Sequence, residues 1–204
     1  MDEPKPVYVL HGTDAFLRDA ARREIVAALV GDADPRLCVS SFDAGAELAD
    51  VFDELRTPPL LAGRRVVVLA DADAFVSAHR EKLEDLLQAP PARSSLVLVV
   101  ASWRAGTRLD KLVRQIGGTR DCSRPDRQGA QRFIQDAARR RGKKIAPAAA
   151  SALGELIGPD LARLDAEVEK LATYAGPRQT ITAEDVGRLV APAAGPEAFA
   201  LANA

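Results

Sequence analysis

The sequence is poor in the residues from which metal centres and disulfide frameworks are built. It has two cysteines, Cys38 and Cys122, and two histidines, His11 and His79, among 204 residues. The cysteines lie far apart, without a C-x-x-C spacing or a histidine pair, which excludes a zinc site with thiolate ligands from this chain alone. We therefore expect two reduced, buried thiols and neither a metal nor a cofactor.

Long hydrophobic runs and an excess of one charge are also missing. No apolar run approaches the roughly 20 residues that a membrane helix needs, and the N-terminal segment is too polar for a signal peptide. The 28 basic and 29 acidic residues nearly cancel, so no overall field draws the protein to nucleic acid or to an anionic membrane. These absences predict a cytoplasmic globular protein without membrane contact, in which any contact with DNA is local or delegated to a partner.

The third absence concerns nucleotide chemistry. Residues 7–29 have the pattern of a buried strand, a tight turn and an amphipathic helix, which is where a nucleotide-binding α/β protein carries its phosphate loop. That loop requires G-x-x-x-x-G-K-[ST], because backbone N–H groups, the lysine and the hydroxyl bind the phosphates and magnesium. The turn here contains one glycine, Gly12, and no lysine. The pattern predicts the architecture of an NTPase without its phosphate-binding chemistry.

Apolar runs alternate with helical patterns along the first 125 residues. Strands are predicted over 7–10, 37–42, 66–69, 95–100 and, at a sheet edge, 119–122, with helices over 16–29, 47–55, 77–88 and 108–116. Asp71 stands where an NTPase holds magnesium, but Ala72 replaces the water-activating acid. Asp71 and Asp73 are predicted instead to cap the next turn. The alternation predicts a doubly wound parallel α/β sheet in a domain spanning 1–125.

The strand signal disappears after residue 125. Helices are predicted over 126–142, 147–157, 160–174 and 182–190, and the segment from Thr182 to Asp185 has the pattern of a capping box. A small all-helical domain is therefore predicted over 126–192. Residues 193–204 have the pattern of a linker followed by the start of a helix, so we expect a truncated third domain.

A set of segments occurs along the chain in a recognisable order: VYVLHGTDAFL (7–17), PLLAGRRVVVL (59–69), 142–147, 158–161, 167–176 and 181–186. These segments resemble the delta subunit of the bacterial DNA polymerase III clamp loader, a non-hydrolysing relative of AAA+ ATPases. Their order and spacing are more specific than any one of them, and together they cover almost the whole chain. The resemblance implies an AAA+-like parallel sheet flanked by helices, then a small all-helical lid domain, then a C-terminal collar domain that begins within 193–204.

The resemblance also implies a function. It implies a non-catalytic subunit of the DNA polymerase III holoenzyme, a DNA-directed DNA polymerase (nucleotidyltransferase), that binds and helps open the sliding clamp during DNA replication. The implied partners are the sliding clamp, the other clamp-loader ATPase subunits through the collar domain, and primed DNA through the complex. No cofactor, phosphate loop or arginine finger is implied.

The resemblance implies a leucine–phenylalanine plug that enters a pocket of the clamp, and the matching positions here are Leu60 and Leu61. With Pro59 and Ala62, these leucines are predicted to form the clamp-binding loop, in which the prolines limit the backbone entropy lost on docking. The alternative is that both leucines fold under the sheet as ordinary core residues.

A run of basic residues follows the first helix of the second domain. Arg140, Arg141, Lys143 and Lys144 stand at the end of that helix, where cations interact favourably with its carbonyl groups. A solvated helix end is one interpretation. A weak contact with DNA phosphate is the other, although no aromatic residue is interleaved to stack on bases.

Two rival functions come from other classes of protein. An α/β enzyme or binding protein would act on a nucleotide or phosphorylated small molecule through His11, Asp14 and Asp71, at the carboxyl ends of the strands. A scaffold protein would keep a degenerate nucleotide-binding fold without chemistry. A pull-down with the sliding clamp and a nucleotide titration with magnesium separate these possibilities.

Overall fold

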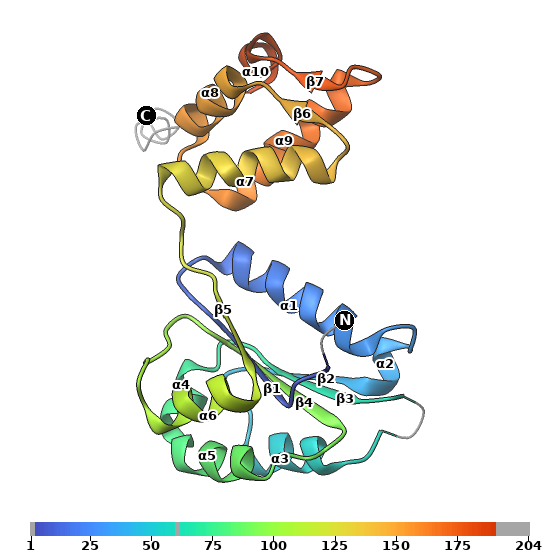
Figure 1. Ribbon diagram of the computed structural model, residues 1–204, viewed down its shortest axis with the longest axis vertical. Helices are drawn as coiled ribbons and strands as arrows, with labels where there is room; N and C mark the ends of the chain where they lie inside the picture. Colours follow the sequence, from blue (N-terminus) through green and yellow to red (C-terminus); the bar gives the residue numbers. More distant parts are fainter. Residues whose placement is uncertain (1–2, 60–61, 191–204) are drawn as a thin grey trace, which may run out of the picture. The chain divides into compact units, whose positions relative to one another are not determined.

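The computed structural model describes residues 3–59 and 62–190. The chain divides into two compact units, Met1–Ser123 and Arg124–Ala204, which we call unit 1 and unit 2 (Figure 1). Each unit has its own secondary structure and buried core. No helix in the described ranges is long and apolar enough to cross a membrane.

Unit 1 is built on a five-stranded parallel sheet. The strand order is β2-β3-β4-β1-β5, and the strands are β1 (Val7–His11), β2 (Val39–Phe42), β3 (Arg65–Leu69), β4 (Ser94–Val100) and β5 (Gly118–Asp121). Every neighbouring pair is parallel. All seven residues of β4 are buried, as expected of a central strand covered on both faces. The predicted parallel α/β sheet is confirmed, with β5 at one edge.

Helices cover both faces of the sheet, unequally. One face is covered by α1 (Ala15–Val30), whose Ala21 packs with the strand residues Leu10, Val68 and Val97. The other carries α3 (Leu48–Arg56), α4 (Asp73–Ala78), α5 (Arg80–Gln88) and α6 (Arg108–Ile116), which pack on alternate residues of the same strands (Figure 1). This arrangement follows from right-handed crossovers, because only the β1–β2 connection runs in the opposite direction across the sheet.

The larger differences from the sequence-based expectation in unit 1 concern two elements. The predicted strand 37–42 begins two residues later, because Asp34 caps and Pro35 starts a short helix, α2 (Pro35–Cys38). The predicted helix 77–88 is split at His79, where α4 ends and α5 begins.

Over residues 124–190, unit 2 is helical except for one short strand pair. Its helices are α7 (Arg127–Arg140), α8 (Pro147–Ile157), α9 (Leu161–Ala175) and α10 (Ala183–Leu189). Its core contains Ile134, Leu153, Leu164 and Leu171, all fully buried. The prediction of an all-helical unit is wrong in one feature: β6 (Lys144–Ile145) and β7 (Thr180–Ile181) form a two-residue parallel pair. This pair keeps Ile181 in the core.

Side-chain caps fix the starts of three helices in unit 2, α7, α9 and α10. Asp126, Asp160 and Thr182 each accept a hydrogen bond from a backbone N–H in the first turn of α7, α9 and α10, respectively. At Thr182 the predicted capping box is confirmed, since the Asp185 carboxylate accepts in return from the Thr182 N–H at 2.8 Å.

Candidate functional site

The segment between α3 and β3 carries the predicted clamp-binding residues. Thr57 closes α3, because its N–H and its hydroxyl both donate to the Asp53 carbonyl, at 2.9 and 2.8 Å. Pro58, which follows, is exposed, whereas Pro59 is buried. Neither proline has an N–H to continue the helix, so the chain leaves α3 at this point. Pro59 thus anchors the near end of the loop in unit 1.

Two arginines hold the far end of the loop. Arg93 donates from Nε to the Gly63 carbonyl at 3.2 Å and from a terminal nitrogen to the Ala62 carbonyl at 3.3 Å. Arg64 donates to the Ser94 carbonyl at 2.7 Å. Both arginines therefore attach the loop to the start of β4.

The structure describes two of the four predicted clamp-binding residues, Pro59 and Ala62. Pro59 is buried and Ala62 is half-buried, so both lie at the anchored ends of the loop. Leu60 and Leu61 lie outside the described residues, and their assignment as a surface plug stays a prediction.

The turn between β1 and α1, where a phosphate loop would lie, is closed by the chain itself. Gly12 has φ +135°, and a Cβ atom added to it would lie 2.2 Å from the backbone carbonyl carbon of Cys122. The Asp14 N–H donates to the Cys122 carbonyl at 3.0 Å. The Arg18 guanidinium donates to the Gly12 carbonyl. The single glycine thus serves close packing against the segment after β5.

The start of α1 is occupied by a carboxylate. Asp14 is only 5% exposed, and its side chain accepts from the Leu17 N–H at 3.0 Å. In an NTPase the corresponding N–H groups face a phosphate, which the helix dipole attracts. Here a phosphate would meet the negative charge of Asp14 instead. The expected absence of a phosphate cradle therefore has a structural counterpart in this turn.

The acids after β3 do not form the predicted turn cap. Asp71 is exposed and adopts φ +48°, a left-handed conformation that aspartate tolerates. Asp73 accepts from the Ala101 N–H at 2.8 Å and from the Ser102 N–H and hydroxyl at 3.0 and 3.1 Å. Burial raises the pKa of Asp73, but these hydrogen bonds outweigh it and hold the pKa below its usual value. The capping prediction is wrong for Asp73, which ties the end of β3 to the loop after β4.

Known proteins are similar to this chain in sequence and in fold. Residues 8–116, just over half of the chain, match the family model described as "DNA polymerase III, delta subunit". The chain belongs to the DNA polymerase III delta subunit family. It is 25% identical over 213 aligned positions to DNA polymerase III subunit delta of Bacillus subtilis (strain 168), covering 98% of this chain and 61% of that protein.

Solved structures agree with the family assignment. The Bacillus subtilis DNA clamp loader delta protein (YqeN) superposes on this chain with a TM-score of 0.75 at 25% identity. The superposition covers 92% of this chain and 59% of the Bacillus subtilis protein. Thermotoga maritima RuvB, a Holliday junction branch migration motor, gives 0.51 at 18% identity over 91% and 61%, which shows a shared AAA+-like fold alone. The chain spans about three-fifths of the length of these relatives.

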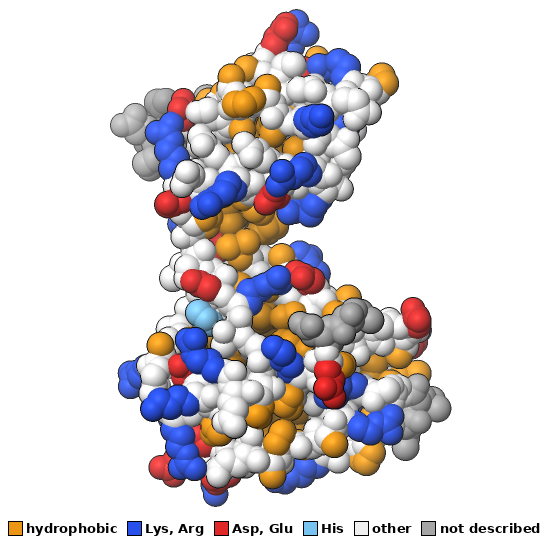
Figure 2. Space-filling view, viewed as in Figure 1, with side chains coloured by type: hydrophobic (Ala, Val, Ile, Leu, Met, Phe, Trp, Pro, Cys, Tyr) orange, Lys and Arg blue, Asp and Glu red, His pale blue; other side chains and the backbone are white. Residues whose placement is uncertain are grey.

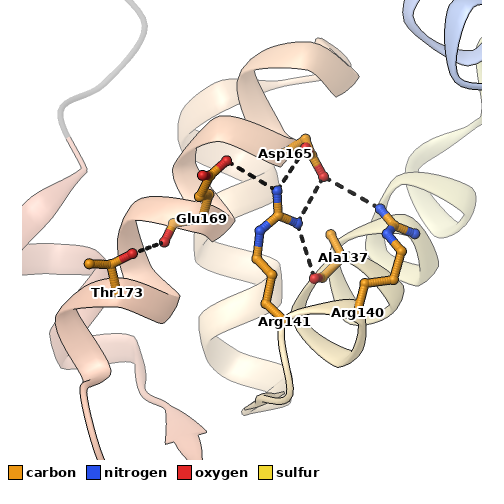
Figure 3. A network of polar contacts seen from close by, with 6 residues as sticks. All are labelled: Ala137, Arg140, Arg141, Asp165, Glu169 and Thr173. Atoms are coloured by element: carbon orange, nitrogen blue, oxygen red, sulfur yellow. Dashed lines mark hydrogen bonds and ion pairs between the residues drawn. The ribbon is translucent and has the colours of Figure 1, made fainter.

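The basic residues at the end of α7 and just after it mostly bond within unit 2. Arg141 donates to both carboxylate oxygens of Asp165, at 3.1 and 2.9 Å, and to the Ala137 carbonyl at 3.1 Å (Figure 3). Its hydrogen bonds lower the pKa of Asp165. Arg140 reaches Asp165 at 3.4 Å and lies over the Phe133 ring.

The two lysines differ from each other. Lys143 donates from Nζ to the carbonyls of Gly176 and Arg178, at 2.6 and 2.8 Å, which satisfies the end of α9. The Lys144 side chain is exposed. Figure 2 shows Lys and Arg side chains scattered over the visible faces of both units, many with Asp or Glu beside them. Arg141 and Lys143 therefore stabilise unit 2, and Arg140 and Lys144 are the exposed members of the four predicted phosphate contacts.

The residues of the rival enzyme hypothesis are not neighbours in the sheet. His11 ends β1 and Asp71 follows β3, with β4 between these two strands. Asp14 is committed to the α1 cap. Within the described ranges, no three His, Cys, Asp or Glu side chains are grouped so that they could hold a metal ion.

Proposed function

We propose that this chain binds the sliding clamp through the loop at residues 58–63 and helps to open it, while partner subunits hydrolyse ATP. The observation that carries the proposal is the anchoring of this loop at both ends in a member of the delta family. Pro59 is buried on one side, and Arg93 bonds the Ala62 and Gly63 carbonyls on the other. Two large apolar side chains, Leu60 and Leu61, stand between the anchors in the sequence.

Anchoring supports binding because it lowers the entropy that the loop loses on docking. Burying two leucines in a pocket of the clamp would contribute about 3–5 kcal/mol at the usual value for large apolar side chains. Leucine in place of the family's phenylalanine keeps an apolar plug without an aromatic ring. The contribution is large enough to dominate a moderate-affinity contact.

The proposal assigns no catalysis to the chain. ATP hydrolysis requires a cradle of backbone donors, a lysine, a magnesium ligand and a positioned water. In the β1–α1 turn the Asp14 N–H bonds the Cys122 carbonyl, and the Asp14 carboxylate fills the start of α1. These contacts favour a holding role over an enzymatic one.

The proposal extends to the other partners that the family implies. We propose that the other clamp-loader ATPase subunits assemble with this subunit through the C-terminal collar domain that the resemblance implies. We also propose that primed DNA reaches the subunit through the complex. Arg140 and Lys144 are the candidates in unit 2 for a weak DNA contact, since Arg141 and Lys143 bond within their own unit.

The test is a double substitution, Leu60→Ala with Leu61→Ala, measured by surface plasmon resonance against the cognate sliding clamp. We expect at least about a tenfold loss of affinity, the equivalent of 1.4 kcal/mol, with an unchanged melting temperature. The matched control is Leu37→Ala in α2, because Leu37 is a leucine of unit 1 that is 49% exposed and lies outside the loop at residues 58–63. This control should bind the clamp as the unmodified chain does.

The opposite pattern would contradict the proposal. A large fall in melting temperature with unchanged clamp affinity would assign the leucines to the core. Equal losses of affinity from Leu37→Ala and from the double substitution would point to nonspecific hydrophobic binding.

A further inference from the structure

A small polar pocket lies at the carboxyl end of the sheet in unit 1, between α4, the start of α5 and the loop after β4. Its volume is about 90 Å³, and its lining includes Ser77, Arg80, Ser102, Arg104 and Thr107. Two arginines therefore line one cavity. We call it the Arg80–Arg104 pocket.

The two arginines differ from most others in the chain. Typical arginines here meet a carboxylate, as Arg114 meets Asp110 at 3.0 Å and Arg65 meets Glu54 at 2.6 Å. In the part of the chain that the structure describes, neither the Arg80 nor the Arg104 side chain makes an ion pair or a hydrogen bond. Their donors are thus available to a ligand in the pocket.

The loop that carries Arg104 is held in place by two acids. Asp73 binds its first residues through the Ala101 and Ser102 N–H groups. Asp110, only 2% exposed, accepts from Trp103 Nε1 and from the Gly106 N–H, both at 2.8 Å. Arg104 therefore projects from a fixed backbone, so little backbone entropy is lost when its side chain binds.

The charge of the pocket favours a monoanion. Two arginines and one aspartate, Asp73, give a formal charge of +2 − 1 = +1 among the lining residues. The Asp73 carboxylate already accepts three hydrogen bonds from Ala101 and Ser102, which reduces its repulsion of an incoming anion. A phosphodiester carries one negative charge and matches this pocket, whereas a free phosphate dianion would leave an excess of negative charge.

The volume of the pocket also fits a single phosphate group. Pockets that bind whole small molecules have about 300–1,000 Å³. At about 90 Å³ the Arg80–Arg104 pocket is too small for a nucleoside, but it admits one tetrahedral phosphate group. The guanidinium fork suits phosphate oxygens.

We propose that the Arg80–Arg104 pocket binds a backbone phosphodiester of DNA, with both guanidinium groups as donors and the Ser77 hydroxyl beside them. Such a contact positions the subunit on the nucleic acid without reading its sequence. It is separate from the clamp-binding loop and from the basic segment of unit 2.

The test is fluorescence anisotropy of a labelled primed oligonucleotide at low ionic strength, with no sliding clamp present. We compare the unmodified chain with the double variant Arg80→Gln, Arg104→Gln. The matched control, Arg23→Gln with Arg132→Gln, removes two charges from exposed arginines of α1 and α7. Melting temperatures verify that all variants fold.

We expect the pocket variant to bind DNA about tenfold more weakly than the control, on any base sequence. The slope of log K against log salt should fall by about 0.7–0.9, as for the loss of one phosphate contact. A second arm titrates inorganic phosphate by calorimetry. Binding of inorganic phosphate that depends on Arg80 and Arg104, with unchanged DNA affinity, would overturn the DNA assignment. No DNA binding by the unmodified chain, or equal binding by the pocket and control variants, would also overturn it.

Discussion

Replacing Gly12 by alanine tests whether the β1–α1 turn is closed by packing. A φ of +135° is a conformation that residues with a Cβ rarely adopt, and such strain costs about 1–3 kcal/mol. The new Cβ would lie 2.2 Å from the carbonyl carbon of Cys122 and 2.3 Å from the backbone nitrogen of Ser123. Because backbone atoms cannot rotate away as side chains do, overpacking adds about 1–3 kcal/mol. We expect Gly12→Ala to lower the free energy of unfolding of unit 1 by about 2–6 kcal/mol.

Equilibrium urea denaturation measures this loss. Trp103 is the one tryptophan of the chain and lies in unit 1, so its fluorescence reports on that unit. Gly63→Ala is the matched control, since a Cβ added there meets nothing within 4 Å. The control should stay within about 0.5 kcal/mol of the unmodified chain, as surface substitutions usually do.

A Gly12→Ala variant that unfolds at the same urea concentration as the control would refute this reasoning. The turn would then have room for another atom between Gly12 and Cys122. Close packing of Gly12 against Cys122 would then no longer argue against a phosphate in that turn.

Two further predictions concern acid stability and catalysis. The Arg178 guanidinium, with the Thr182 N–H, lowers the pKa of Asp185 from 3.8 to about 2. Because this folded-state pKa lies below the unfolded one, Asp185 should add at most about 2 kcal/mol to the free energy of unfolding above pH 4. Solvent screening at the exposed Arg178 lowers that value, and the stabilisation should be lost as the pH falls towards 2. Circular dichroism against pH should show this acid-dependent loss in the unmodified chain and a smaller one in Asp185→Asn; identical curves would contradict it. Phosphate release assays should find no magnesium-dependent ATP turnover above background, and turnover abolished by Asp71→Asn would contradict the holding role.

The sequence predicts the sheet well because its central strands are buried on both faces. Runs such as Val66 to Leu69 and Leu96 to Val100 are apolar without alternation, which is typical of parallel strands under helices. Helix starts are equally predictable from the sequence where a side chain caps them, as Asp126 and Thr182 do. These signals are local, so a single sequence suffices to find them.

The missed features depend on contacts between distant residues. The β6–β7 pair has two residues a strand, too few to show any periodicity, and residue 145 pairs with residue 181. The break at His79 has no glycine or proline to mark it. Arg93 bonds carbonyls 30 residues earlier in the chain, so nothing near it in sequence indicates that it anchors the candidate loop.

The position of β1 in the sheet has a consequence for synthesis of the protein. β1 is made first, yet both of its partners come late: Val7 pairs with Leu96 in β4, and His11 pairs with Asp121 in β5. On the ribosome, at about 5–20 residues a second, this strand therefore waits several seconds before either partner exists. β1 therefore has to remain unpaired through most of the translation of unit 1, so pausing before residue 94 should increase the yield of misfolded chains.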